Sequence, residues 1–112
     1  MSPITTHVLD TRSGQPARGL AITLSKLENN KFTELASGHT NDDGRIADLL
    51  EKGSLKPGIY SMHFDTGAYH KNLGIAGFYP EAVINFEIKN VDEHYHIPLL
   101  LSPFGYSTYR GS

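Results

Sequence analysis

The sequence predicts an all-β protein, a two-layer β-sandwich that forms a single domain over residues 1–112. Several short stretches alternate apolar and polar side chains, which is the pattern of a strand with one face in a core. Turn-forming residues separate these stretches at the spacing typical of sandwiches. The length of 112 residues suits one domain with a real hydrophobic core.

Four stretches carry the alternation most clearly. Their expected core faces are Leu20, Ile22 and Leu24; Tyr60, Met62 and Phe64; Ala82, Ile84, Phe86 and Ile88; and Tyr95, Ile97, Leu99 and Leu101. Gly, Pro, Asn and Asp cluster between them, and the expected turns cover residues 13–16, 28–30, 41–44, 56–58 and 90–92.

The segment from Thr66 to Gly77 breaks the alternation and predicts one or two helical turns. Thr66 is the expected N-cap, because its hydroxyl can accept a hydrogen bond from a free backbone N–H. Gly74 is the expected end of the helix, since glycine adopts the left-handed conformation that follows many helices.

The strand near the C-terminus has an unusual second face. His94, His96, Pro98 and Leu100 alternate with its core face, and apolar residues on an outward face indicate that something covers it. Another subunit is the economical cover for so short a chain. The final residues, 106–112, contain two tyrosines and an arginine and predict an ordered last strand.

Composition excludes several function classes. Ten basic and twelve acidic residues give a net charge of −2, which argues against a nucleic-acid binder. The absence of cysteine excludes disulfides, thiolate metal sites and a cysteine nucleophile.

No signal peptide or membrane-spanning run is visible, which favours the cytoplasm. Six histidines are many for this length and are the main candidates for chemistry.

From the residues alone, the candidates stay open. His7 fits a packed histidine better than a catalyst; His39 and His63 suit the surface, and His70 has no assigned role. His94 and His96 could supply two metal ligands, with His7 as a third, but outward histidines at an interface fit better. Residues 41–44 resemble part of a calcium loop and predict a tight turn instead. Arg45, which follows, is either a solvated charge, the favoured interpretation, or an anchor for an anionic oxygen.

Five segments resemble one family. These are residues 4–11, residues 14–17, the Asp43-Gly44-Arg45 turn, residues 94–103 and the terminal Tyr109-Arg110-Gly111-Ser112. Together they are similar to the 5-hydroxyisourate hydrolases, the transthyretin-like enzymes of urate and purine catabolism, over essentially the whole chain. The Tyr-Arg-Gly-Ser ending is the most specific element.

The resemblance implies a sandwich of about eight strands with one short helix. It also implies a homotetramer, a dimer of dimers, with active sites in the channel between dimers. The implied reaction is hydrolysis of the ring amide of 5-hydroxyisourate, a small-molecule substrate, to 2-oxo-4-hydroxy-4-carboxy-5-ureidoimidazoline without metal or cofactor. The implied site residues are His7, Arg45 and His96 for catalysis and binding, with Tyr109, Arg110, Gly111 and Ser112 for binding.

Two other functions remain as hypotheses. A transthyretin-like carrier would bind small aromatic ligands in the same channel without consuming them. A purely structural sandwich would need none of these histidines. The histidine and arginine set and the chain ending favour the hydrolase, in which two histidines share the base and proton-donor roles.

Overall fold

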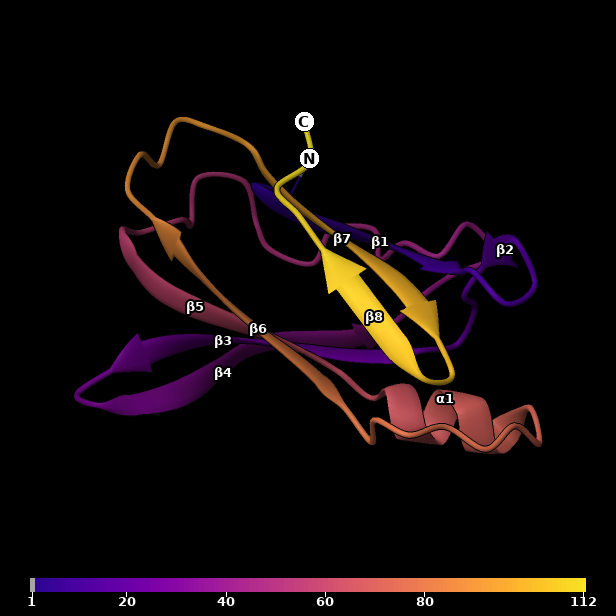
Figure 1. Ribbon diagram of the computed structural model, residues 1–112. Helices are drawn as coiled ribbons and strands as arrows, with labels where there is room; N and C mark the ends of the chain where they lie inside the picture. The colour runs from indigo at the N-terminus through magenta and orange to yellow at the C-terminus, as the bar shows by residue number, and fades with distance from the viewer. Residues whose placement is uncertain (1) are drawn as a thin grey trace.

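Eight strands and one helix build the fold in the computed structural model, which describes residues 2–112 (Figure 1). The strands form two four-stranded sheets, in the orders β2-β1-β7-β8 and β4-β3-β5-β6. Their bounds are β1 Ile4–Asp10, β2 Gln15–Pro16, β3 Ala21–Glu28, β4 Lys31–His39, β5 Gly58–Phe64, β6 Ala82–Ile88, β7 Tyr95–Ser102 and β8 Gly105–Thr108. The predicted sandwich of about eight strands with one short helix is confirmed.

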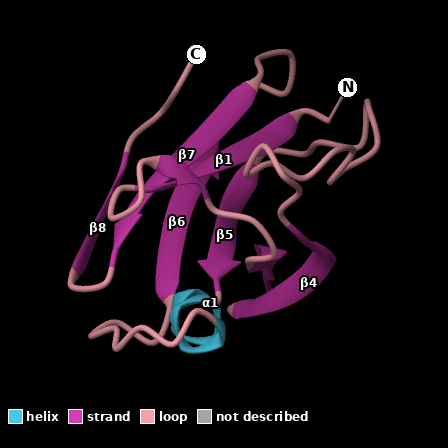
Figure 2. Cartoon of the chain, turned by 90° about the vertical axis from the view of Figure 1, so that its right-hand side faces the viewer, coloured by secondary structure: helices cyan, strands magenta, loops and turns pink. Residues whose placement is uncertain are grey.

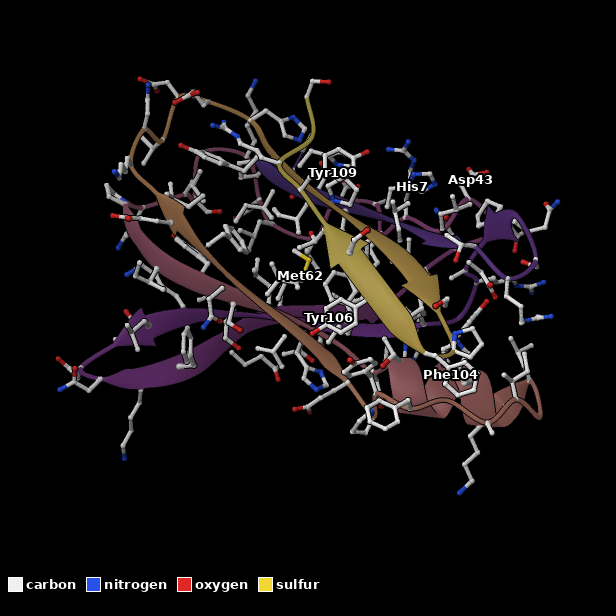
Figure 3. All side chains as sticks on the ribbon, in the orientation of Figure 1. His7, Asp43, Met62, Phe104, Tyr106 and Tyr109 are labelled. Atoms are coloured by element: carbon white, nitrogen blue, oxygen red, sulfur yellow. The ribbon has the colours of Figure 1, made fainter. Side chains whose placement is uncertain are left out.

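The core fills the space between the sheets, where Figure 3 shows Met62. The apolar faces predicted from alternation all point inward. On β3, β5 and β7 they are buried, and on β6 the two end residues, Ala82 and Ile88, are buried while Ile84 and Phe86 pack against the core from its margin. The polar members of β6 are exposed, as period-2 alternation requires.

The pairing of β1 with β7 determines where the functional residues lie. These two strands run parallel although about ninety residues separate them, and they are hydrogen-bonded over their whole length. Their register places Thr5 beside His96 and His7 beside Pro98. Side chains of paired residues point to the same face of a sheet. The outward face of this sheet therefore carries Thr5 and His7 from β1 next to His96 from β7.

Helix α1, Thr66–Asn72, lies at one end of the sandwich, opposite the end where both chain termini lie (Figure 2). Its N-cap is Asp65, which accepts a hydrogen bond from the N–H of Ala68, so the predicted cap at Thr66 is wrong. The Thr66 hydroxyl instead donates to the carbonyl of Tyr79, which ties the helix to the following loop. Gly74 follows the helix with a φ of +71°, as predicted.

Two boundaries differ from the sequence prediction. The expected turn over residues 13–16 contains the two-residue strand β2, because Leu9 and Asp10 pair with Pro16 and Gln15. The predicted last strand is confirmed for Gly105–Thr108 only. Beyond Thr108 the chain meets β7 again at Gly111, whose N–H donates to the carbonyl of His96 at 2.9 Å.

Candidate active site

A tight turn delivers Arg45 to the edge of the first sheet. The Asn41 side-chain oxygen accepts hydrogen bonds from the N–H groups of Asp43 and Arg45, at 2.9 and 3.1 Å. Gly44 has a φ of +75°, and a Cβ there would lie 2.5 Å from the Val8 carbonyl oxygen. Only glycine allows this approach. The turn thus places Arg45 in a bridge with His7 of β1, and the interpretation of residues 41–44 as a turn is confirmed.

A hydroxyl group joins two of the histidines. The Thr5 Oγ1 atom lies 2.7 Å from Nε2 of His94 and 2.8 Å from Nδ1 of His96. His96 is half-buried and His94 is exposed. Because Nδ1 of His96 is occupied by Thr5, Nε2 is the ring nitrogen left for a substrate.

The C-terminal segment closes the other side of the site. The Thr108 hydroxyl donates to the Pro98 carbonyl at 2.7 Å, and the Gly111 N–H donates to the His96 carbonyl. Gly111 also packs on the imidazole, since a Cβ there would lie 2.5 Å from Cδ2 of His96. The last residues are therefore fixed against the ring that they border.

These elements enclose an open cleft of about 400 Å³ on the outer face of the sheet. It spans from the Arg45 turn across β1 and β7 to the C-terminal segment, or three strand spacings of about 4.8 Å, roughly 14 Å in all. That width suits a small ring compound. The lining residues are Thr5, Arg45, His94, His96, Tyr109, Gly111 and Ser112.

His7 stands beside this cleft. Figure 3 shows it on the outer side of the β1–β7 sheet, away from the core. It is half-buried, and its backbone pairs with Arg45. A positive charge on its ring lowers the pKa of His96, so the two rings interact electrostatically. The structure therefore brings five of the seven predicted site residues into one cleft and places His7 next to it.

The cleft keeps His96 neutral. Burial lowers the pKa of His96, and the positive charge of Arg45 lowers it further, with smaller contributions from His94 and His7. Hydrogen bonding to the Thr5 backbone opposes these effects and does not outweigh them. The ordinary pKa of a histidine is near 6.5. Because the pKa of His96 is lower than this, the unprotonated ring predominates at neutral pH. His96 is thus able to accept a proton.

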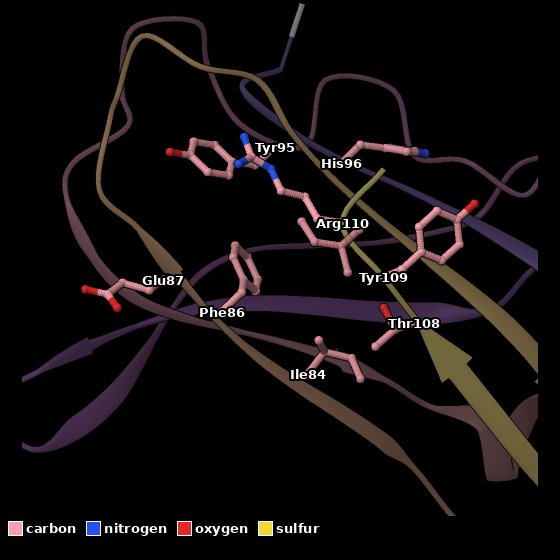
Figure 4. Close-up of a pocket in the computed structure, with 9 residues that line it drawn as sticks. Ile84, Phe86, Glu87, Tyr95, His96, Thr108, Tyr109 and Arg110 are labelled. Carbon is pink, nitrogen blue, oxygen red and sulfur yellow. The ribbon is translucent and has the colours of Figure 1, made fainter. Parts of the chain in front are cut away.

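Arg110, the remaining predicted residue, points away from this cleft. Its guanidinium carbon lies 4.5 Å from the centre of the Tyr95 ring, and one of its NH₂ groups lies 3.3 Å from both a Glu93 carboxylate oxygen and the His94 carbonyl. Figure 4 shows it beside Tyr95 while Tyr109 points the other way. Arg110 borders a second, largely apolar cleft of about 260 Å³ between β6 and the C-terminal segment. There it anchors the chain end.

The other histidines lie elsewhere. His39 is exposed, and the partly exposed His63 lies 2.9 Å from a carboxylate oxygen of Glu81. His70 is buried in α1, and neither ring nitrogen has a hydrogen-bond partner among residues 2–112. Tyr69 beside it donates to the buried Asp10, and burial together with that carboxylate raises the pKa of Tyr69 to about 12. This helix serves the fold.

Thr5 is the site residue that sequence analysis missed. Alternation placed it on the face of His7, but a threonine in a strand carries no signal of its own. Its contact with two histidines depends on the parallel pairing of β1 with β7, which the residue pattern does not specify. The only signal in the sequence that could have identified Thr5 is its position two residues before His7, on the same face of the strand.

The fold has solved counterparts. The structure superposes on sea bream transthyretin in complex with thyroxine with a TM-score of 0.94 at 33% identity, covering 98% of this chain and 95% of that one. It superposes on Klebsiella pneumoniae 5-hydroxyisourate hydrolase with a TM-score of 0.85 at 38% identity, covering 97% and 92%. The sandwich is therefore that of a transthyretin-fold protein. The backbone alone does not separate a carrier from a hydrolase.

The relatives of the chain in sequence define its family. The chain belongs to the HIUase/Transthyretin family, whose model matches residues 4–111. It is 50% identical to mouse 5-hydroxyisourate hydrolase, covering 99% of this chain and 96% of the relative. It is 44% identical to the enzyme of that name from Ralstonia nicotianae, covering both chains fully. The predicted family resemblance is confirmed.

Two features of the described chain bear on other functions. Across residues 2–112, no three His, Asp or Glu side chains are grouped so that they could hold a metal ion. In the same residues, no helix has the length and apolar character needed to cross a membrane.

Proposed function

We propose that this chain hydrolyses the ring amide of 5-hydroxyisourate, as the names of its relatives state for them. The observation that carries the proposal is the cleft in which Arg45, a His96 of lowered pKa and the C-terminal segment meet. A hydrolysis without cofactor needs a base for water and a donor for the developing oxyanion, and this cleft holds both. The product is 2-oxo-4-hydroxy-4-carboxy-5-ureidoimidazoline.

The residues divide the chemistry as follows. Nε2 of His96 takes a proton from water while the water oxygen bonds to the carbonyl carbon of the six-membered ring. Negative charge then develops on the carbonyl oxygen, where the forked, permanently charged guanidinium of Arg45 donates hydrogen bonds. The carbon–nitrogen bond breaks as protonated His7 gives its proton to the ring nitrogen, which leaves a carboxylic acid. The acid loses its proton to solvent and ends as a carboxylate, and transfer of the proton on His96 to His7 restores both histidines.

The C-terminal residues hold the substrate in this arrangement. Tyr109 and Ser112 line the cleft, and Gly111 fixes the rim against His96. Arg110 contributes through its contacts with Glu93 and the His94 carbonyl, which keep the segment in place. Removal of the last four residues is therefore expected to abolish turnover.

The functional assembly is proposed to be a homotetramer, a dimer of dimers. Two observations support it: apolar Leu100 lies on the outward face, and large aromatic side chains are exposed near the β7–β8 turn, with Phe78 69% and Phe104 73% accessible. Exposed apolar surface of this kind marks interfaces. Sedimentation tests this assembly. A cytoplasmic location stays a prediction.

The site variants test the hydrolase assignment. His7→Gln, Arg45→Gln and His96→Gln are each expected to slow the loss of freshly generated 5-hydroxyisourate, followed by ultraviolet absorbance, by about 10²–10⁴-fold, the range known for a general base or an oxyanion donor. His39→Gln, an exposed histidine elsewhere, is the matched control and should retain activity. Rates close to the unmodified protein in all three site variants would exclude the assignment.

The second candidate, a carrier of small aromatic ligands, has one specific observation in its favour, the close superposition on a thyroxine-bound transthyretin. It predicts saturable binding of thyroxine to this chain with no acceleration of 5-hydroxyisourate loss. The hydrolase names of relatives at 40–50% identity make it the weaker candidate.

A further inference from the structure

The contact between Thr5 and two histidines constrains their protons. A threonine hydroxyl has one hydrogen to donate and lone pairs to accept with. Its oxygen lies within hydrogen-bond distance of Nε2 of His94 and Nδ1 of His96. When the hydroxyl donates to one ring, it can meet the other only as an acceptor, so that ring must carry its hydrogen on the nitrogen facing Thr5.

Two arrangements of neutral rings follow. If Thr5 donates to His94, then Nδ1 of His96 carries a hydrogen and its Nε2 has a free lone pair. If Thr5 donates to His96 instead, then Nε2 of His96 carries the hydrogen and cannot accept a proton from water. The orientation of one hydroxyl therefore separates a competent base from an incompetent one.

We propose that Thr5 and His94 are positioning residues that hold His96 as the Nδ1–H tautomer, with the Thr5 hydroxyl donating to Nε2 of His94. This deepens the proposed function, since it assigns a task to the two cleft residues that the hydrolytic scheme leaves unused. The hydrogen bond that one ring nitrogen of a histidine makes usually determines whether the other nitrogen is free for chemistry. After His96 accepts a proton, the same Nδ1–H bond to Thr5 persists, so no side chain has to move.

The surroundings keep these three side chains together and His96 neutral. The register of β1 and β7 fixes the backbone of Thr5 directly beside His96, which keeps the hydroxyl within hydrogen-bond reach of the ring. Arg110 donates to the His94 carbonyl at 3.3 Å, which fixes the backbone that carries the exposed His94 ring. The positive charge of Arg45 disfavours a protonated His96 and leaves the neutral tautomers as the relevant states.

Nuclear magnetic resonance of the full ¹⁵N-labelled chain reads the tautomer without substrate. We expect Nδ1 of His96 to give the signal of a protonated nitrogen and Nε2 that of an unprotonated one at neutral pH. Thr5→Val, which keeps the shape and removes the hydroxyl, should let His96 revert toward the Nε2–H form that imidazole favours in water. Thr5→Ser should restore the original signals. An Nε2–H form of His96 in the unmodified protein would overturn the proposal.

Turnover provides the second measurement. Thr5→Val and His94→Phe should each lower kcat by about ten- to a hundredfold, less than the loss of the base itself, and Thr5→Ser should recover most of it. Thr33→Val, the same change on the exposed strand β4, is the matched control. Full activity and an unchanged His96 tautomer in Thr5→Val would refute the proposal.

The two proposals fail differently. Absence of hydrolysis by the unmodified protein would exclude the proposed function and leave the tautomer measurement valid. If Thr5→Val does not fold, the tautomer of the unmodified protein and the turnover of His94→Phe still decide the matter.

Discussion

Gly111→Ala separates activity from stability. The added Cβ would lie 2.5 Å from Cδ2 of His96 and 3.2 Å from Cγ of Pro98. Carbon atoms in contact ordinarily stay 3.5–4.0 Å apart, so either the imidazole or the C-terminal segment must move by about 1 Å. Pro98 is buried and β7 is paired on both sides, whereas Tyr109 is 58% exposed. The segment, with the cleft rim it forms, is therefore expected to move.

A displacement of about 1 Å in a catalytic arrangement can cost about 10²-fold in rate. We expect Gly111→Ala to lower kcat/KM for 5-hydroxyisourate by about that factor. The free energy of unfolding should fall by only about 1 kcal/mol, the lower end of the range for overpacking, because the segment is exposed. Absorbance decay of fresh substrate and urea unfolding measure the two quantities.

Gly105→Ala is the matched control. It lies in the same C-terminal hairpin, and the nearest atom to its added Cβ is 3.8 Å away, an ordinary contact. It should leave both quantities nearly unchanged. Wild-type kcat/KM in Gly111→Ala, or an equal loss in Gly105→Ala, would show that packing of the chain end against His96 does not govern turnover.

Four further outcomes are expected. The kcat/KM value should fall as pH drops through the lowered pKa of His96, so its acid limb should lie below pH 6.5; a limb above that value would contradict a neutral His96. His70→Phe should raise the free energy of unfolding by about 1–3 kcal/mol, because it removes two buried ring nitrogens that have no partner in the described chain. A urea unfolding midpoint lower than that of the unmodified protein would contradict this prediction. Arg110→Leu should lower turnover while costing at most about 1 kcal/mol of stability, since exposed ion pairs contribute little; unchanged turnover would count against its anchoring role. Activity should persist after exhaustive chelation, and its loss on chelation with recovery on adding metal would require a metal in the reaction.

Much of the fold could be predicted from the sequence because the alternation of apolar and polar residues identifies the buried face of a strand. The alternation from Tyr95 to Leu101 has the period of the pleat, and the structure buries that face as expected. The N-cap was mispredicted by one residue, since Asp65 and Thr66 are both capping types and the pattern does not rank them. The short strand β2 was missed because two residues are too few to show alternation.

The site was only partly accessible from the sequence. His7, Arg45 and His96 were named from the family resemblance, whereas residue patterns alone favoured a solvated Arg45 and a packed His7. The contacts that give them a role connect strands far apart in the chain, such as the Arg45–His7 bridge and the register that places Thr5 beside His96. No local pattern encodes such pairings. The inward or outward direction of each side chain was predictable, and its neighbours were not.

Time-resolved ¹³C nuclear magnetic resonance of freshly generated 5-hydroxyisourate, with and without the purified protein, tests the hydrolytic role of the Arg45–His96 cleft. The substrate also decays spontaneously, so the comparison is between the two rates. The protein should accelerate the disappearance of the ring amide carbonyl signal, with a matching rise of the ring-opened carboxylate, and His96→Gln should return the rate toward the spontaneous one. Decay at the spontaneous rate in the presence of the unmodified protein would contradict a hydrolase.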